Sequence, residues 1–377
     1  MRIEDATTRK YQHIRDELAE AIRTGHFPPK QKLPSETQLA KKFVASRGTV
    51  LRALLDLSHA GLIERRRGSG TFVKINPPRS GGKFGLIAPA LPDLPEVRTG
   101  SVLGIILRKI AEETGRRGYS VMHHALSDSP SRKEEIWQAV QRIIEQRTGG
   151  AFFLPFPVAS PETQMLNLEI ARALAKAGIP IVLLDCDLMD RPERSNFDVV
   201  SADNQQGGAL LAEHLVKQGC RRIGFVSNVR DASTVSERIL GYRSVLTKHD
   251  IAASPKWLLY EPELKEATLK KMMEQYSLDG LIFKDDHLAA LGCRYLASMG
   301  YRVGQEVKVA GFDDAPIATL LGVPLTTVRQ PLNDVAVNAI NLLLDRIQNP
   351  SQPGRTLMVN CELVVRESTK GPPRSKA

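Results

Sequence analysis

Cysteine is scarce in this sequence of 377 residues, and the few cysteines are scattered. The four of them are Cys186, Cys220, Cys293 and Cys361, and none belongs to a CxxC pair. Isolated cysteines of this kind are typical of small buried hydrophobic residues, whereas zinc sites and disulfide frameworks need closer spacings. We therefore expect neither a bound metal nor a cofactor.

Long apolar runs are also missing. No stretch approaches the roughly 20 apolar residues that are needed to cross a bilayer. The first residues, MRIEDATTRKYQ, are polar and contain no apolar signal core. We expect a cytoplasmic protein with no membrane partner.

Catalytic motifs are absent as well. The sequence has no HxxxH, CxxC or GxSxG, and no Walker or GxGxxG loop after a strand. The pairs Asp285/Asp286 and Asp313/Asp314 could in principle act as acid and base, and Asp285, Asp286 and His287 could be read as metal ligands. However, neighbouring residues at the start of a helix point in different directions. We predict that the chain is not an enzyme.

The positive charge is concentrated at the front of the chain. Residues 1–83 contain 17 Lys and Arg against 8 Asp and Glu, a balance of +9, whereas the whole chain has +10. A basic head on a neutral body is typical of a module that binds a polyanion. A solvated basic surface is the alternative that charge alone leaves open.

The basic head has the pattern of a winged helix. Apolar residues at helical spacing predict a helix over residues 8–25, and Ser35 with Gln38 predicts a capped helix that ends at Phe43. Ser46 caps a third helix, with Val50, Leu54 and Leu57 on its buried face. Two strand-like runs, LIERRR and TFVKI, follow and are joined by Gly68-Ser69-Gly70. Helix, helix-turn-helix and hairpin in this order predict a winged-helix DNA-binding domain over residues 1–75.

The rest of the chain alternates short apolar runs with amphipathic helices. This alternation predicts an α/β fold with parallel, doubly wound sheets that helices cover on both faces. The body is long enough to form two lobes. We place a linker at residues 76–83, where NPPRSGGK has no apolar periodicity, the two-lobed body at 84–368, and a disordered tail at 369–377.

The start of the third head helix is the best candidate for reading DNA. Side chains there can reach base edges and phosphates in the major groove. Arg47 suits guanine or phosphate, Ser46 and Thr49 suit phosphate, and Gly48 allows close approach. Further candidates in the head are Ser35, Arg52, Arg65, Arg67, Gly68, Ser69 and Gly70. The wing arginines suit a narrow minor groove, although a solvated hairpin edge is the alternative.

Residues 8–75 resemble the winged helix of the GntR family of bacterial regulators. The shared motifs are LPSE, SRGTV, GLIERR and GSGTFV. The resemblance implies DNA contacts at Ser46, Arg47, Gly48, Thr49 and Gly68. The sequence departs from the family pattern at Thr37 and Leu51, where the family often has Arg. These departures concern base preference rather than DNA binding, and Arg52 either replaces a contact or faces solvent.

Residues 84–368 are similar to the effector domain of LacI-type regulators, which shares its fold with periplasmic sugar-binding proteins. The stretches that carry the likeness include VSADNQQGGALLAEHLVKQGCRRIGFVS, FKDDHLAALG and VAGFDDAPIATLLGVPLTTVRQP. The combination of head and body resembles the arabinose-regulator subgroup. It implies a sugar-like ligand in the cleft between the lobes, at the carboxyl ends of the strands. The resemblance assigns Arg238, Asp285 and Asp313 to this cleft and, more weakly, Asp93 and Phe156.

Each cleft residue has a structural alternative. Asp285 could simply cap the helix that follows it, Asp313 or Asp314 could cap a turn, and Arg238 could pair with a surface carboxylate. Lys284 could neutralise the neighbouring aspartates or favour a phosphorylated or carboxylated ligand.

The sequence therefore predicts a homodimeric regulator that binds double-stranded operator DNA. We expect a repressor whose operator affinity is controlled by a small carbohydrate ligand. A ligand-dependent activator, a sugar-binding receptor and an enzyme are the alternatives, and a DNA mobility shift with and without sugars separates a regulator from the last two.

Overall fold

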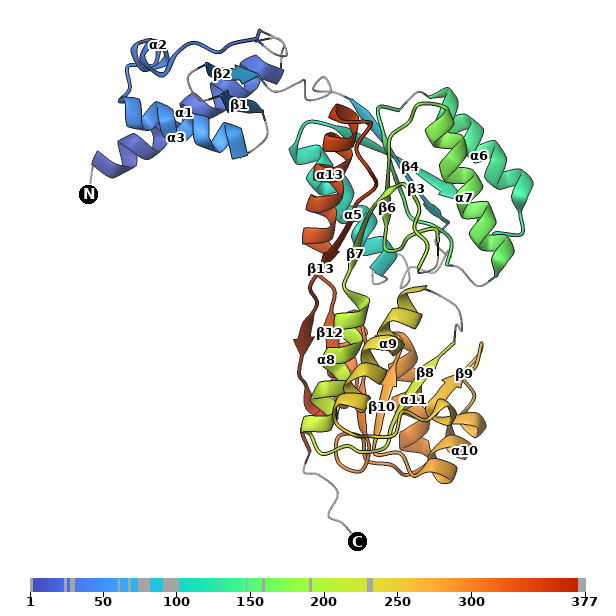
Figure 1. Cartoon of the computed structure of the whole chain (residues 1–377). Helices are drawn as coiled ribbons and strands as arrows, with labels where there is room; N and C mark the ends of the chain where they lie inside the picture. Colours follow the sequence, from blue (N-terminus) through green and yellow to red (C-terminus); the bar gives the residue numbers. More distant parts are fainter. Residues whose placement is uncertain are drawn as a thin grey trace.

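The computed structural model shows a small head and a larger body of two lobes (Figure 1). It describes residues 3–23, 26–27, 31–59, 62–66, 69–73, 82–90, 102–127, 129–146, 148–157, 160–189, 192–228 and 233–371. All structural statements below concern these residues.

The head contains three helices and a two-stranded hairpin, as the sequence predicts. The elements are α1 (Ile3–Arg23), α2 (Glu36–Lys42), α3 (Arg47–His59), β1 (Ile63–Arg66) and β2 (Gly70–Val73). Ser35 and Gln38 form the predicted capping box at α2, since the Gln38 amide donates to Ser35 Oγ and the Ser35 amide donates to Gln38 Oε1. Ser46 Oγ accepts from the Thr49 amide at 3.1 Å and caps α3.

The head has its own hydrophobic core. Apolar residues from all three helices and both wing strands are buried in it, including Ile14, Leu18, Leu39, Leu54 and Val73. The segment before α2 also pairs with the wing, because the Leu33 amide donates to the Thr71 carbonyl at 2.8 Å. The helix-turn-helix and the wing therefore form one unit.

The first lobe is built on a six-stranded parallel sheet in the order β13-β7-β6-β5-β3-β4. Its strands are β3 (Lys83–Pro89), β4 (Ser120–Leu126), β5 (Ala151–Phe153), β6 (Ile181–Leu184), β7 (Asp198–Ala202) and β13 (Thr356–Val359). Its helices are α5 (Val102–Arg116), α6 (Lys133–Glu145), α7 (Pro161–Lys176) and α13 (Leu332–Gln348). Helices α6 and α7 cover one face and α5 and α13 the other (Figure 1), so two separate cores sandwich the sheet.

The second lobe has a four-stranded parallel sheet in the order β11-β10-β8-β9. Its strands are β8 (Ile223–Ser227), β9 (Leu258–Tyr260), β10 (Gly280–Phe283) and β11 (Lys308–Ala310). Its helices are α8 (Asn204–Lys217), α9 (Ser233–Lys248), α10 (Glu266–Tyr276), α11 (Asp286–Ser298) and the short α12 (Ile317–Leu320). Helices α8 and α9 pack on one core of the sheet and α10 and α11 on the other.

The chain crosses between the lobes three times, after β7, after β12 (Thr327–Arg329) and after β13. The first and third crossings are tied together, because the Asp203 amide donates to the Val359 carbonyl at 2.8 Å and the Cys361 amide donates to Gln206 Oε1 at 2.8 Å. Strand β14 (Glu362–Val364), which follows the third crossing, pairs antiparallel with β12. The three crossing segments are thus joined to one another, the arrangement in which two lobes connected by short segments can move by a hinge.

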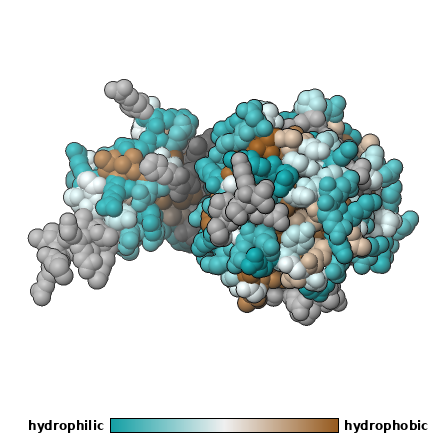
Figure 2. Space-filling model, turned by 90° about the horizontal axis from the view of Figure 1, so that it is seen from below, coloured by the Kyte–Doolittle hydropathy of each residue, from teal (hydrophilic) through white to brown (hydrophobic). Residues whose placement is uncertain are grey.

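The predicted fold class is confirmed, while two predicted boundaries shift. Lys83, placed in the linker, pairs with Ser120 as the first residue of β3. At the other end, Thr369 is fully buried and its carbonyl, like that of Gly371, accepts from Lys308 Nζ, so ordered chain continues past residue 368. Residues 76–81 of the predicted linker and 372–377 of the predicted tail lie outside the described residues. Figure 2 shows a mostly hydrophilic face on which apolar residues form small separate patches.

Candidate functional site

A cavity of about 410 Å³ lies between the two lobes. It is lined by residues that follow the carboxyl ends of strands in both sheets, the position where open parallel sheets bind ligands. Its first-lobe wall is mostly apolar and includes Pro89, Ile106, Leu154, Pro155, Leu184, Leu332 and Val335. Its second-lobe wall carries charge from Arg238, Lys284, Asp285 and Asp313. A ligand with hydroxyl groups on one side and a less polar face on the other suits these walls.

Arg238 lies at the cleft with only 8% of its surface exposed, and several contacts fix its guanidinium group. Its Nε donates to Asn204 Oδ1 at 2.8 Å, its Nη1 donates to the Lys284 carbonyl, and its guanidinium carbon lies 3.6 Å from the centre of the Phe312 ring. Burial and these contacts exclude the alternative in which Arg238 pairs with a surface carboxylate. Its Nη2 remains 3.9 Å from Asp313 Oδ1, close to the space where a ligand would lie.

The close packing of α8 and α9 explains how Arg238 reaches this place. A Cβ on Gly208 would lie 2.0 Å from the Arg238 carbonyl oxygen, and one on Gly241 would lie 1.9 Å from the Gln205 carbonyl oxygen. Only glycine fits at these two positions, so the helix backbones touch and Arg238 is brought against Asn204.

Asp285 combines the two roles that the sequence left open. It is the N-cap of α11, with Oδ1 accepting from the Leu288 amide at 2.7 Å, and it also lines the cavity. Its other oxygen pairs with Lys284 Nζ. Burial raises the pKa of Asp285, but the charge and hydrogen bond of Lys284 outweigh it, and the pKa lies below its usual value. Lys284 therefore neutralises its neighbour, which is the first of its two predicted roles.

Asp313 lies in a strained turn at the cavity. Asp313 and Asp314 have positive φ angles of 112° and 53°, which non-glycine residues rarely adopt. Asp313 Oδ1 accepts from Gln330 Nε2 at 2.7 Å. Burial raises the pKa of Asp313 to about 7, against the opposing effect of Arg238. The turn is thus built to present one carboxyl group to the cleft.

The second member of each aspartate pair is structural. Asp286 is fully buried and accepts from Thr327 Oγ1 at 2.6 Å and from the Ala315 amide at 2.7 Å. Asp314 is paired with Arg329 and Arg366. Neither pair therefore presents two carboxylates to one ligand as acid and base. Among the described residues, no three His, Cys, Asp or Glu side chains are arranged to hold a metal ion. Asp285, Asp286 and His287 are therefore not grouped as ligands of one metal.

Phe156 does not belong to the cleft, contrary to the prediction. Its side chain is 2% exposed and packs in the first-lobe core beside α6 and α7. Its backbone N–H donates to Asn167 Oδ1, and Asn167 Nδ2 donates back to its carbonyl, so the ring turns inward. The neighbours Pro155 and Pro157 line the cavity instead. Asp93 lies outside the described residues.

Asp185 is the main cleft residue that the sequence analysis missed. It follows β6 directly, lines the cavity from the first lobe and has a positive φ of 74°. Burial raises its pKa, and Arg238 across the cleft opposes this rise. The same strand-end rule that selected Asp285 and Asp313 could have found it. Gln330 and Asn204, which hold Asp313 and Arg238, carry no comparable sequence signal.

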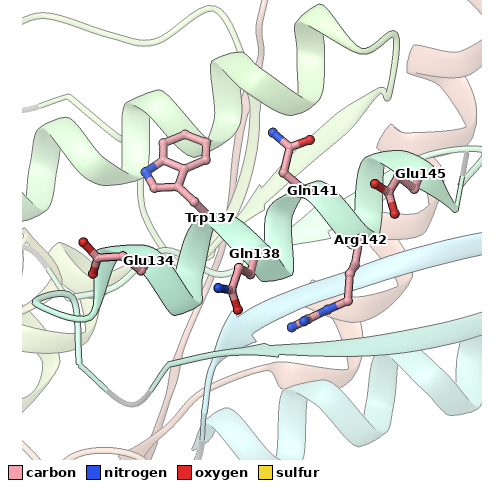
Figure 3. Close-up of a pocket in the computed structure, with 6 residues that line it drawn as sticks. All are labelled: Glu134, Trp137, Gln138, Gln141, Arg142 and Glu145. Atoms are coloured by element: carbon pink, nitrogen blue, oxygen red, sulfur yellow. The ribbon is translucent and has the colours of Figure 1, made fainter.

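A second hollow, of about 580 Å³, runs along α6 and shares no lining residue with the cleft. Figure 3 shows that its lining residues, among them Trp137, Gln141 and Arg142, all come from this one helix. A small ligand there would be contacted from one side only, whereas ligand sites enclose most of the ligand surface. The cleft between the lobes is therefore the candidate ligand site.

The head presents the second candidate site at the start of α3. Arg47 and Gly48 are exposed, and a Cβ on Gly48 would approach only Ser46 Oγ, at 3.8 Å. Ser46 Oγ and Thr49 Oγ1 lie 2.8 Å apart and are bonded to each other. Ser46 is exposed, whereas Thr49 is only 8% exposed, so the structure leaves Ser46 better placed than Thr49 for the predicted phosphate contact. Arg47 Nη2 donates to Thr37 Oγ1 at 2.5 Å. The helix N-terminus, with its free amides and an exposed arginine, suits a phosphate backbone.

Of the other predicted DNA contacts in the head, some side chains are already bonded within the protein and others are exposed. Arg65 is paired with Glu36 at 2.5 Å, and the Arg52 guanidinium lies 4.3 Å from the centre of the Tyr11 ring. Ser35 Oγ is engaged in the capping box. Ser69 and Gly70 are exposed at the wing tip, with Gly70 at a φ of 117°. Arg67 and Gly68 lie outside the described residues.

None of the described helices is both long enough and apolar enough to cross a membrane.

Two family models match the chain. Residues 10–73 match the model of bacterial regulatory proteins of the gntR family, and residues 212–369 match a periplasmic binding protein-like domain. The first match covers the head, and the second covers most of the second lobe together with α13, β13 and β14.

Among curated proteins, the arabinose metabolism transcriptional repressor of Geobacillus stearothermophilus is 27% identical, over 98% of this chain and 100% of its own length. The ribose operon repressor of Halalkalibacterium halodurans is 25% identical over 78% of this chain and 81% of its own length.

Solved structures of regulators share the fold. The complex of the transcriptional regulator CelR with cellobiose superposes with a TM-score of 0.65 and 22% identity, over 85% of this chain and 90% of that one. A LacI family regulator from Enterococcus faecium with bound ribose gives a TM-score of 0.59 and 20% identity, over 78% of this chain and 100% of that one.

Proposed function

We propose that this chain, a gntR-type DNA-binding head joined to a periplasmic-binding-protein-like body, is a transcriptional repressor controlled by a small carbohydrate. The observation that carries the proposal is that one chain holds both an exposed helix N-terminus with Arg47 and a cleft between two lobes with Arg238, Asp285 and Asp313. The names of its relatives, which are regulators, support this function and not a catalytic one.

The chemistry of the cleft supports a hydroxylated ligand. A hydroxyl group both donates and accepts, so a sugar needs carboxylate acceptors beside a guanidinium donor. Asp185 faces the cleft from one lobe and Arg238 and Asp313 face it from the other. A ligand that bonds to both lobes at once would stabilise their closed arrangement.

We further propose that the regulator acts in the cytoplasm as a homodimer on a pseudo-palindromic operator. Two identical heads related by a twofold axis match two half-sites of opposite orientation. Closure of the lobes would change the spacing of the heads through the segment that joins the wing to β3. A coupling free energy of about 1–3 kcal/mol would suffice to change operator affinity by one or two orders of magnitude.

The first experiment identifies the ligand and the response together. The full-length protein is screened by thermal shift with arabinose, ribose, cellobiose, sugar acids and sugar phosphates, because a ligand stabilises the state that it binds. Binding of the protein to promoter fragments of the host genome is then measured by mobility shift with and without each hit. We expect a hit to weaken the shift; strengthening would mark an activator, and a protein that shifts no duplex even in dilute salt would contradict the proposal.

Two variants separate the sites. Arg47→Ala should cost about 1–3 kcal/mol of operator affinity and leave the thermal shift by the ligand unchanged. Asp313→Ala should keep operator binding and lose the response to the ligand. A normal ligand response in Asp313→Ala would remove Asp313 from the proposed site.

A further inference from the structure

The first turn of α2 contacts two of the four arginines that the sequence proposes for DNA binding, Arg47 and Arg65. Thr37 Oγ1 accepts from Arg47 at the start of α3, and Glu36 Oε1 accepts from Arg65 on wing strand β1, each at 2.5 Å. Two consecutive residues thus join the recognition helix to the wing. Neither residue was among the contacts that the sequence suggested.

This turn is itself well fixed. The capping box of Ser35 and Gln38 closes it from within. Residues before it add to the wing, since the Leu33 amide donates to the Thr71 carbonyl and the Val73 amide donates to the Gln31 carbonyl, both at 2.8 Å. Leu39 at its far side is buried in the head core. The side chains of Glu36 and Thr37 therefore start from a fixed backbone.

Arg47, in contrast, is long and exposed, although its backbone is fixed. The start of α3 is capped by Ser46, and Val50 is fully buried. Within the described part of the chain, Thr37 is the one hydrogen-bond partner of the Arg47 side chain. A guanidinium that is oriented before binding loses less conformational entropy when it meets a base, and its planar fork reads guanine only in the correct orientation.

We propose that Thr37 is a positioning residue for DNA recognition: its hydroxyl orients the Arg47 guanidinium and so determines how sharply Arg47 discriminates between bases. The Glu36–Arg65 pair keeps the wing in register with the same turn. This inference rests on the proposed function and adds a determinant of operator specificity to it.

The test uses the full-length protein and a pool of randomised duplexes. Wild-type protein selects a preferred duplex, and dissociation constants are then measured for it and for each single-base variant. Thr37→Val, which keeps the shape and removes the hydroxyl, should weaken binding to the selected duplex roughly threefold to tenfold. It should flatten base preference at the same position that Arg47→Ala flattens. Thr37→Ser, which keeps the hydroxyl, should retain both.

A double-variant cycle distinguishes orientation from direct contact. If Thr37 acts through Arg47, then Thr37→Val should have no further effect in an Arg47→Ala background. An equal loss in both backgrounds, or an unchanged base preference in Thr37→Val, would overturn the inference. Thr37→Ala repeats the test without a β-branched side chain in case the valine disturbs α2. A wild-type protein that selects no sequence from the pool would instead contradict the proposed function.

Discussion

The side-chain amide of Gln330 donates to Oδ1 of Asp313 at 2.7 Å. Gln330 belongs to the segment by which the chain crosses from β12 to α13, and Asp313 ends the turn after β11. One hydrogen bond therefore connects a hinge segment to the carboxyl group that faces the cleft. A change in the charge or partners of Asp313 has a direct route to the hinge.

Ligand binding should depend on pH through Asp313. Burial raises its pKa to about 7, so it is partly protonated in neutral solution. A ligand hydroxyl that donates to this group favours the ionised form, which lowers the pKa on binding. Affinity should therefore rise with pH through about 7 and level off above it. For a ligand that binds only the ionised form, calorimetry should give a dissociation constant up to about tenfold higher at pH 6 than at pH 8.

Two variants check the assignment. Asp313→Asn should lose this pH dependence between pH 6 and 8, since nothing titrates at the position. Gln330→Met removes a donor that favours the ionised carboxylate, so the step in affinity should move to higher pH. Wild-type affinity that stays constant from pH 6 to pH 8 would show that Asp313 does not bind the ligand in its ionised form.

Gly48→Ala should separate stability of the head from DNA binding. The new Cβ would approach only Ser46 Oγ, at 3.8 Å, so the protein itself has room for it. In a helix interior, alanine in place of glycine stabilises by roughly 0.5–1 kcal/mol, and at Gly48, the second residue of α3, we expect a gain at or below the lower end of this range. In contrast, DNA affinity should fall if the phosphate backbone approaches this part of α3. Chemical denaturation followed by circular dichroism and a mobility shift measure the two effects, and unchanged DNA affinity would place the phosphates elsewhere.

The sequence predicted most elements of the body because buried parallel strands form continuous apolar runs. It did not mark β7, where Asp198 and Ser201 interrupt the apolar run, nor the edge strand β4 as far as His123 and His124, nor the three-residue strand β9. Periodicity is a weak signal for strands that are short or only partly buried. The order of the strands and the three crossings came from the structure.

The candidate site was predictable where a rule about strand ends applied. Asp285 and Asp313 lie where that rule puts them, and Asp185 satisfies it too. The rule fails at Phe156, which also follows a strand. There the Asn167 side chain binds the Phe156 backbone and the ring turns into the core, and the sequence position does not show this direction. The place of Arg238 depends on the contact of Gly208 with α9, which is a tertiary relation.

Val44 in the turn of the helix-turn-helix is strained. It has a positive φ of 47°, although β-branched residues disfavour this region, and its side chain is 78% exposed, so it contributes little to the core. Relief of the strain should raise the free energy of unfolding by roughly 1–2 kcal/mol. Glycine also gives the unfolded chain more conformational freedom, which cancels about half of this gain. Val44→Gly should therefore stabilise the head by about 0.5–1 kcal/mol.

The two tryptophans make this measurable. Trp137 and Trp257 both lie in the body, so tryptophan fluorescence follows the body while circular dichroism also follows the helical head. Val44→Gly should shift the circular dichroism transition and leave the fluorescence transition in place. Val44→Asn, which tolerates the same conformation, is the matched control. A destabilised head in both variants would mean that the Val44 side chain makes a favourable contact.

Asp198 anchors the end of the first lobe opposite the cleft. It is fully buried at the start of β7 and accepts from Arg346 Nε at 2.9 Å and from both the backbone amide and Nε of Arg355 at 3.0 Å. Burial raises the pKa of Asp198, but the two arginines outweigh it and bring the pKa below its usual value. Its contribution to stability is therefore present above about pH 4 and is lost as the pH falls through the lowered pKa.

Asp198→Asn should destabilise the protein by about 3 kcal/mol, because it leaves two guanidinium groups facing a neutral amide. Urea denaturation followed by tryptophan fluorescence at pH 7 measures the loss. Asp345→Asn is the matched control, since Asp345 pairs with the same Arg355 but its side chain is 36% exposed, and exposed pairs contribute under about 1 kcal/mol. If the two variants were equally stable, the Asp198 cluster would contribute no more than a surface ion pair, and the anchoring of β7 to α13 would have to come from apolar packing alone.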